Sequence, residues 1–349
     1  MAATLKDVAK LANVSIITVS RVVNQSSYVH KATRARVLAA IEELQYVPNQ
    51  TASNLRSRQN DTLALIVPDI TTTFWTAMAR GAEDEAWASG YGVFLCNTDD
   101  DPVKEARYVD IVTRRRVAGI AIVPTLGSAE LLRRLLRRRQ QFVMLHRKIV
   151  DIDADTIRSD SRRAARELTA RLLDAGWRRC AYVGGSLGGS LGHDRLAGFT
   201  EALAARGLVP EAQLVKIGEH TQRSGYALTT QLLRDKPLPE ALLIANSRLA
   251  LGALHALAAA GVRVPEDLAV ATFFELSRLV DDSRLAWTPL TIATLPAYDI
   301  GRLGIRRLIA RIGGDTGPLE DRTLAARITA HPDEGAKPLL PLSQALVPA

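Results

Sequence analysis

From Thr62 onward, short apolar runs alternate with amphipathic stretches of helix length, and this rhythm constrains the fold more than any other feature. Strands that are apolar along their whole length are typical of parallel sheets covered by helices on both faces. A polar passage around Asp151–Asp160 divides the pattern into two rounds, which predict two α/β lobes with a ligand-binding cleft at the strand ends. The runs are TLALIVP, YGVFLCN, VAGIAIVP, QFVMLH, CAYVGG, ALLIAN, LAVATF and TIATL.

The first sixty residues follow another pattern, which predicts three short helices. Thr4 and Asp7 have the spacing of a capping box at the start of a helix. Asn13 suits a left-handed turn position, and Ser15 can cap a second helix. A third helix is expected over Ala32–Leu44. Helix, tight turn and capped helix are the elements of a helix-turn-helix unit.

The stretch VSIITVSRVVN, Val14–Asn24, consists mostly of β-branched residues and could be read as a strand. Its valines Val19 and Val22 nevertheless share one side of a helix, and the polar residues lie on another side. Ile16 and Ile17 lie outside the valine side. We predict a helix whose isoleucines either face a binding partner or complete the small core.

The charge is uneven along the chain. The whole protein carries a net charge of +8, which permits an anionic partner without identifying one. A short basic segment before a larger domain is typical of nucleic-acid binding. A second basic cluster, at Arg114–Arg116 and Arg133–Arg139, is expected to be solvated helix surface. Within residues 1–60 the basic residues Lys6, Lys10, Arg21, Lys31, Arg34, Arg36, Arg56 and Arg58 outnumber the acidic residues Asp7, Glu42 and Glu43.

LKDVAKLANVSIITVSRVVN followed by YVHKATRARVLAAIEELQYVPNQTASNLRS closely resembles the DNA-binding headpiece of the lactose-repressor (LacI/GalR) family. The resemblance implies that the second helix enters the major groove of double-stranded DNA. Arg21 can donate two hydrogen bonds to one guanine, a contact that contributes about 1–3 kcal/mol of discrimination. The other residues expected to touch DNA, mostly at phosphates, are Thr4, Ser15, Thr18, Ser20, Asn24, Tyr28, Thr33, Tyr46 and Asn49.

Ile16 and Ile17 match the positions that choose the base sequence in this family. They cannot form side-chain hydrogen bonds, so they predict apolar contacts with thymine methyl groups. After the motif Tyr46-Val47-Pro48-Asn49, the resemblance implies a hinge helix in the minor groove. Leu55 would wedge between base pairs there, with Ala52 and Asn54 beside it.

VPDITTTFWTAMARGAEDEAWASGYGVFLCNTDDDPVKE, RLAGFTEAL and ANSRLALGALHAL resemble the periplasmic-binding-protein-like core of the same family. The expected fold is therefore an α-helical, lambda-repressor-like headpiece followed by a two-lobed α/β core. The resemblance implies an effector site in the cleft, where Phe74 stacks on the ligand and Arg195 holds a polar or anionic group. The other expected effector residues are His146, His220, Asn246, Phe274 and Glu275.

The departures from the family pattern bear on the effector. Family members often have aspartate where this chain has His146, Ser247 and Phe274, and Glu275 is the remaining acid of its local motif. Fewer acids beside Arg195 favour an anion. A sugar acid such as gluconate is therefore expected rather than a neutral sugar, unless the three positions contact no ligand.

GGSLGGSLG, Gly184–Gly192, offers a competing interpretation, because it matches the nucleophile elbow of serine hydrolases at Ser186 and at Ser190. An elbow needs one serine on a sharp turn, not a doubled glycine loop, so we do not expect an enzyme. A small-molecule-binding protein without a DNA role is the other alternative, and the headpiece argues against it.

The domain boundaries follow from these patterns. We expect a headpiece at 1–49, a hinge at 50–61, a core at 62–330 and a disordered tail at 331–349. Lobe 1 would comprise about 62–158 and 291–317, and lobe 2 about 159–290 and 318–330. The tail has no heptad pattern, so a homodimer is expected. The presence of two cysteines and the lack of an apolar leader or membrane span favour a cytoplasmic protein. With a DNA-binding role it is expected at the nucleoid, and no metal or cofactor is expected.

Overall fold

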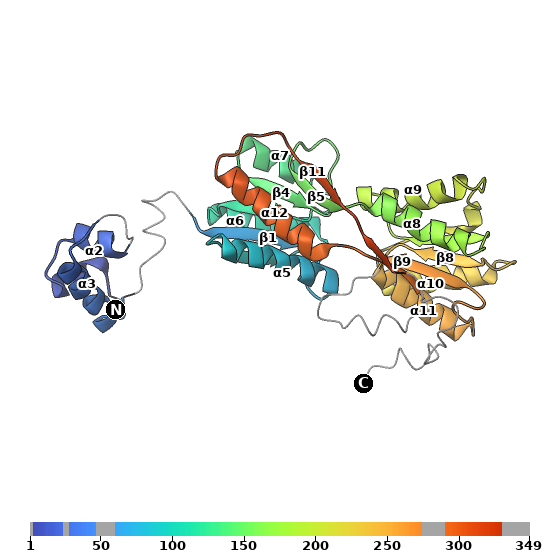
Figure 1. Ribbon diagram of the computed structural model, residues 1–349, viewed down its shortest axis with the longest axis horizontal. Coiled ribbons are helices and arrows are strands. Elements are labelled where there is room, and N and C mark those ends of the chain that lie inside the picture. The colour runs from blue at the N-terminus through green and yellow to red at the C-terminus, as the bar shows by residue number, and fades with distance from the viewer. Residues whose placement is uncertain (1–2, 24–27, 47–59, 274–289, 330–349) are drawn as a thin grey trace. The chain divides into compact units, whose positions relative to one another are not determined.

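The computed structural model describes residues 3–23, 28–46, 60–273 and 290–329 (Figure 1). The chain divides into two compact units, Met1–Asn60 and Asp61–Ala349. Most of the predicted hinge and the whole predicted tail lie outside the described residues. The same is true of Asn24, Asn49, Ala52, Asn54 and Leu55 in the first unit, and of Phe274 and Glu275 in the second.

In its described residues the first unit contains the helices α1 (Leu5–Leu11), α2 (Ile16–Val23) and α3 (Lys31–Glu43). The capping box is present: the Thr4 N–H donates to the Asp7 carboxylate at 2.9 Å, and the Asp7 N–H donates to Thr4 Oγ1 at 3.4 Å. Asn13 has a φ of 51°, the predicted left-handed turn. The Thr18 N–H donates to Ser15 Oγ at 3.1 Å, so the Ser15 side chain caps α2. The predicted order of helix, turn and capped helix is confirmed.

The core of this unit is made of buried valines and alanines from all three helices, Val19 and Val22 of α2 among them. VSIITVSRVVN is therefore a helix rather than a strand. Ile16 and Ile17 are 45% and 64% exposed, so they do not complete the core. Tyr46, by contrast, is buried in it, with 7% of its surface exposed. This burial gives Tyr46, which the sequence places among the residues expected to touch DNA, a role in the core of the unit.

The second unit consists of two lobes, each built on a sheet of six strands among the described residues (Figure 1). All eight predicted apolar runs are strands. In lobe 1 the order is β11-β5-β4-β3-β1-β2, with β1 (Thr62–Val67), β2 (Gly92–Asn97), β3 (Gly119–Ile122), β4 (Phe142–Leu145), β5 (Thr156–Ser159) and β11 (Asp321–Leu324). In lobe 2 it is β12-β10-β9-β8-β6-β7, with β6 (Cys180–Gly184), β7 (Val215–Ile217), β8 (Ala241–Ile244), β9 (Ala269–Phe273), β10 (Leu290–Thr294) and β12 (Arg327–Thr329).

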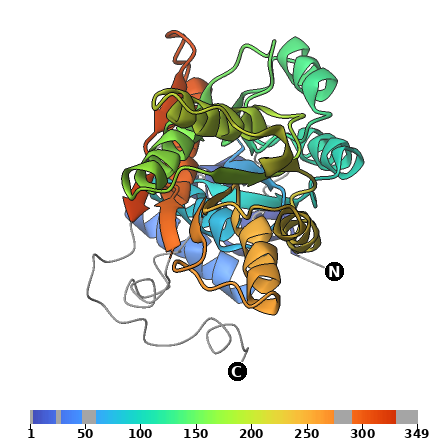
Figure 2. The same ribbon diagram turned by 90° about the vertical axis from the view of Figure 1, so that its right-hand side faces the viewer.

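Helices cover both faces of each sheet, as the apolar strands predict (Figure 2). In lobe 1, Leu63 and Leu65 face α5 (Thr73–Ala88) and α12 (Ala297–Ile312). The alternate residues Ala64 and Ile66 face α6 (Pro102–Arg114) and α7 (Ala129–Arg137). In lobe 2, α8 (Ser161–Asp174) and α9 (Ser190–Ala204) cover one face, and α10 (Gln222–Arg234) and α11 (Ser247–Ala259) cover the other. A 3-10 helix, Ala212–Leu214, precedes β7.

The strand pairing corrects the expected lobe boundaries. Leu290–Thr294 pairs with β9, so this segment belongs to lobe 2 rather than to lobe 1. Asp321–Leu324 pairs with β5, so it belongs to lobe 1 rather than to lobe 2. β12 runs antiparallel to β10, so the lobe 2 sheet is mixed rather than wholly parallel. The chain crosses between the lobes after β5, after β10 and after β11.

Helices α10 and α11 pack closely because glycines lie at their contact. A Cβ atom placed on Gly252 of α11 would lie 1.9 Å from the backbone oxygen of Gln222. A Cβ atom on Gly225 of α10 would lie 2.2 Å from the backbone oxygen of Leu249. The first turn of α11, which carries polar residues toward the cleft, is thereby held against α10. Among the helices that the structure describes, none is long and apolar enough to span a bilayer.

Candidate functional site

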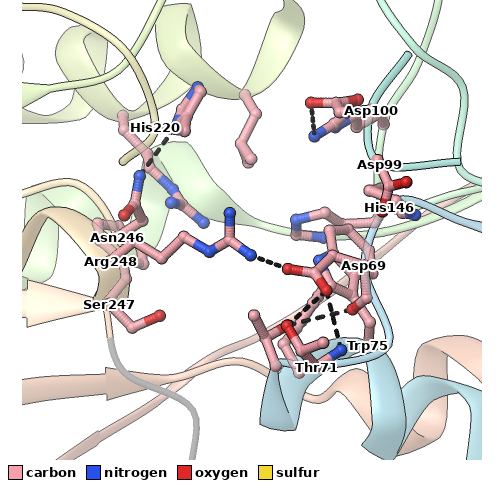
Figure 3. Close-up of a pocket in the computed structure, with 17 residues that line it drawn as sticks. Asp69, Thr71, Trp75, Asp99, Asp100, His146, His220, Asn246, Ser247 and Arg248 are labelled. Atoms are coloured by element: carbon pink, nitrogen blue, oxygen red, sulfur yellow. Dashed lines mark hydrogen bonds and ion pairs between the residues drawn. The ribbon is translucent and has the colours of Figure 1, made fainter. Parts of the chain in front are cut away.

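A pocket of about 420 Å³ lies between the two lobes, at the carboxyl ends of the parallel strands (Figure 3). Five of the effector residues predicted from the sequence, Phe74, His146, Arg195, His220 and Asn246, line it together. Ser247 lines it as well. Lobe 1 adds Pro68, Asp69, Thr71, Thr72, Trp75, Asp99, Asp100 and Arg147, and lobe 2 adds Leu191, Arg248 and Phe273.

Phe74, Trp75 and His146 form an aromatic wall on the lobe 1 side. The Phe74 ring centroid lies 4.6 Å from that of Trp75 and 4.5 Å from that of His146. Phe74 was predicted from the sequence, and Trp75 was not. Both residues belong to the first turn of α5, which begins directly after the loop that follows β1. An apolar wall beside polar groups suits the carbon face of a sugar ring.

His146 follows β4 and has a φ of 61°. Its side chain is buried, and its Nδ1 has no hydrogen-bond partner among the described residues. Burial, followed by the positive charges of Arg195 and Arg147, lowers the pKa of His146 well below its usual value. The imidazole is therefore neutral at physiological pH. The Nδ1 atom of a neutral ring can form one hydrogen bond with a ligand hydroxyl.

His220 faces the pocket from lobe 2, beside Asn246. The Leu249 N–H donates to Asn246 Oδ1 at 2.8 Å, so the Asn246 side chain caps α11. The amide nitrogen of Asn246 therefore points to His220 Nδ1, 2.8 Å away, and donates to it. Burial, and then Arg195 and Arg147, lower the pKa of His220 to about 4. His220 is neutral, with its proton on Nε2.

The cations of the pocket differ in how they are held. Arg195 is 4% exposed, its guanidinium carbon lies 4.0 Å from the centroid of the Phe273 ring, and it donates to the Ala245 carbonyl. Arg147 donates to both carboxylate oxygens of Asp100, at 2.5 and 3.1 Å. A third arginine, Arg248 in the first turn of α11, forms an ion pair with Asp69 across the cleft (Figure 3).

Three aspartates that line the pocket were not predicted from the sequence: Asp69, Asp99 and Asp100. A usable signal was present, because Asp69 follows β1 and the other two follow β2, where ligands of parallel sheets bind. Lys104 lies outside the lining and pairs with Asp99 at 2.5 Å. Within the described residues, no group of three or more His, Cys, Asp or Glu could hold a metal ion.

The loop Gly184–Gly192 leads from β6 into α9. The Gly188 N–H donates to Ser186 Oγ at 3.2 Å, and the Lys148 N–H donates to Ser190 Oγ at 3.5 Å. In the part of the chain that the structure describes, neither serine hydroxyl is hydrogen-bonded to a histidine. The loop therefore lacks the serine–histidine contact that a hydrolase needs.

The first unit presents a second candidate site on α2. Ile16, Ile17 and Arg21 are exposed on this helix, and Tyr28 in the loop that follows is 86% exposed. Thr4 and Ser15 are exposed, but each also caps a helix. Thr18, Ser20 and Thr33 are half-buried. An exposed helix that carries an arginine and two isoleucines suits insertion into the major groove.

Comparison with known proteins decides the family. Residues 4–49 match the family described as bacterial regulatory proteins of the lacI family. Residues 60–333 match the periplasmic binding proteins and sugar binding domain of the LacI family. The chain belongs to the LacI family. As a member of this family it is a DNA-binding transcriptional regulator with a core of the sugar-binding type, which confirms the resemblance, the fold class and the regulatory role expected from the sequence.

Relatives of this LacI-family protein match over nearly their whole length. Catabolite control protein A of Staphylococcus xylosus is 33% identical over 308 residues, which cover 88% of this chain and 92% of that protein. The ribose operon repressor of Escherichia coli is 33% identical over 316 residues, covering 89% and 93% of the two chains. The lac repressor dimer bound to operator and an anti-inducer superimposes with a TM-score of 0.82 at 25% identity, covering 94% and 98%.

Proposed function

We propose that this LacI-family regulator is a homodimeric, cytoplasmic repressor whose affinity for a pseudo-palindromic operator is set by a small sugar-acid effector. Two features of this chain carry the proposal: the exposed α2 face, and a pocket to which both lobes contribute side chains. The relatives support the repressor role, because they include the ribose operon repressor and an operator-bound lac repressor dimer.

The α2 helix reads the operator. Arg21 binds guanine, and Ile16 and Ile17 press against thymine methyl groups in the major groove. Two copies related by a two-fold axis present this helix to two half-sites of the same symmetry. Leu55, which lies outside the described residues, inserts into the minor groove between the half-sites.

A sugar acid is supported by the charges around the pocket. Arg147, Arg195 and Arg248 line it together with Asp69, Asp99 and Asp100, and Lys104 neutralises Asp99 from outside. The lining residues alone balance, with three positive charges and three negative ones, and Lys104 adds one positive charge beside Asp99 from outside the lining. Burial first, and then the positive charges of Arg195 and Arg147, lower the pKa values of His146 and His220. The aromatic wall and the hydroxyl groups of Thr71, Thr72 and Ser247 suit a polyhydroxylated chain.

The effector acts by changing how the lobes close on each other. Because both lobes line the pocket, a bound ligand stabilises one closure angle over another. The ligand shifts the equilibrium only by the difference between its affinities for the two states. In a dimer, this difference changes how the two headpieces are presented to the operator.

Genome-wide mapping of the sites bound by the full-length protein tests the DNA role. We expect discrete pseudo-palindromic sites, and gel-shift affinity for them that changes when the effector is added. Absence of sequence-specific binding at moderate salt would contradict the proposed regulatory role, and would leave a small-molecule-binding protein without a DNA role.

For the effector class, a thermal-shift comparison of gluconate, glucuronate and galacturonate with their neutral counterparts is decisive. Stabilisation by the neutral sugars alone would refute the sugar acid.

A further inference from the structure

The three arginines of the pocket are not equally able to bind a ligand. Arg195 is almost fully buried, with its guanidinium packed on Phe273 and a hydrogen bond donated to a backbone carbonyl. Arg147 is chelated by both oxygens of Asp100 and also donates to the Pro124 carbonyl at 3.3 Å. The Arg248 side chain is 46% exposed, and it contacts one oxygen of one carboxylate. Of the three arginines, Arg248 is therefore the most accessible to a ligand.

The position in front of Arg248 is one that a carboxylate already fits. Asp69 Oδ1 accepts hydrogen bonds from the N–H and the hydroxyl of Thr71, at 2.9 and 2.6 Å. Its other oxygen, Oδ2, pairs with Arg248 from the opposite lobe. The local turn thus holds Asp69 in place whether or not Arg248 is present. Figure 3 shows the Arg248 guanidinium and the Asp69 carboxylate facing each other across the pocket.

Asp69 also explains how Arg248 is tolerated at its position. Arg248 lies in the first turn of α11, where the helix dipole disfavours a positive charge. A carboxylate opposite the guanidinium offsets this unfavourable interaction. A ligand carboxylate would do so equally well, and its remaining hydroxyl groups could reach Thr71, Thr72 and Ser247 in the same pocket.

We infer that Arg248 binds the carboxylate of the effector and that Asp69 competes with the effector for the same guanidinium. This inference rests on the proposed sugar-acid effector, and it assigns the acid group to a residue other than Arg195. A neutral sugar brings no charge to replace that of Asp69, so the pair favours acids over neutral analogues. Displacement also replaces a bridge within the protein by a bridge through the ligand, which couples binding to the contact between the lobes.

Isothermal titration of the full-length protein with gluconate and with glucitol, its neutral alcohol, tests the inference. Arg248→Gln should weaken gluconate binding about 10- to 100-fold, the range of one charge-assisted pair, and should leave glucitol within about twofold. Arg248→Lys, which keeps the charge but loses the planar fork, should fall in between. Asp69→Asn should strengthen gluconate binding several-fold, because the internal competitor loses its charge.

Two variants serve as matched controls. Arg223→Gln removes an exposed arginine of α10 that does not line the pocket. Asp174→Asn breaks an ion pair with Arg206, and neither residue lines the pocket. Neither should change gluconate affinity. Circular dichroism and urea unfolding of each variant establish that it is folded.

The possible outcomes separate this inference from the proposed function. If gluconate binds and Arg248→Gln leaves its affinity unchanged, or if Asp69→Asn weakens it, the role of Arg248 is refuted and the sugar-acid effector stands. If the wild-type protein binds glucitol or glucose but not gluconate, glucuronate or galacturonate, both proposals are refuted. If it binds none of these compounds, the proposed sugar-acid effector is refuted, and the role of Arg248 with it.

Discussion

The depressed pKa of His220 predicts that acid destabilises the core of this protein. The unfolded chain binds a proton at His220 as the pH falls below about 6.5, whereas the folded chain does so only below about 4. Acid therefore favours the unfolded chain across this window, and stability is lost as the pH falls through it. The physical cause is burial of the ring, reinforced by the charges of Arg195 and Arg147.

The size of the effect follows from the two pKa values. At about 1.36 kcal/mol per pKa unit, lowering the pH from 7 to 5 removes about 2 kcal/mol of unfolding free energy through His220 alone. His146, whose pKa is also lowered, adds a loss of the same sign. The pH dependence that comes from carboxyl groups is the same in the wild type and in a His220 variant, so it cancels when the two proteins are compared.

Urea unfolding of the wild type and of His220→Gln at pH 7 and at pH 5 measures this effect. We expect the variant to lose about 2 kcal/mol less than the wild type between the two pH values, whatever its stability at pH 7. His255→Gln, which removes an exposed histidine of α11, is the matched control and should retain the wild-type loss. Equal losses in His220→Gln and in the wild type would show that His220 is not held neutral by its surroundings.

Three further perturbations test other parts of the structure. Replacing Ile16 and Ile17 by Thr should alter the bases chosen in a binding-site selection, with a change of about 1–3 kcal/mol in discrimination at the contacted positions. The free energy of unfolding in urea should change by less than about 1 kcal/mol, because both residues are exposed. An unchanged base preference would show that these residues do not read the operator. Gly252→Ala places a methyl group 1.9 Å from a backbone oxygen of α10 and should cost about 1–3 kcal/mol of stability; a gain, as for an unhindered helical glycine, would contradict the close packing. Asp155→Ala removes the 2% exposed partner of two arginines of α12 and should cost about 3 kcal/mol or more in the same assay; a near-neutral result would show that solvent screens the cluster.

Much of the fold was predictable because it depends on local pattern. The eight apolar runs were recognisable as strands because each is apolar over the length of a strand, and most of them are buried on both faces of a sheet. The four remaining strands were not, because β5, β7, β11 and β12 are short and carry polar or half-buried residues. Their pairing, rather than their composition, makes them strands, and two of them decide where the chain crosses between lobes.

The candidate site divides in the same way. Phe74 and Arg195 stand in motifs that can be matched along the chain, and both line the pocket. The expected charge of the pocket rested on the positions where family members have aspartate and this chain does not. It was incomplete, because Asp69, Asp99 and Asp100 enter the pocket from other loops. Formal charge read from a motif omits the charges that other loops bring to the same place.

The sequence by itself determined the capped helices of the first unit, the valine side of VSIITVSRVVN and the apolar strands of two α/β lobes. These features depend on residues a few positions apart, where the periods of helix and strand apply directly. Only the tertiary structure decided that Tyr46 is buried, that β10 and β11 exchange lobes, and that Arg248 faces Asp69. Those outcomes depend on how distant segments cross and pair.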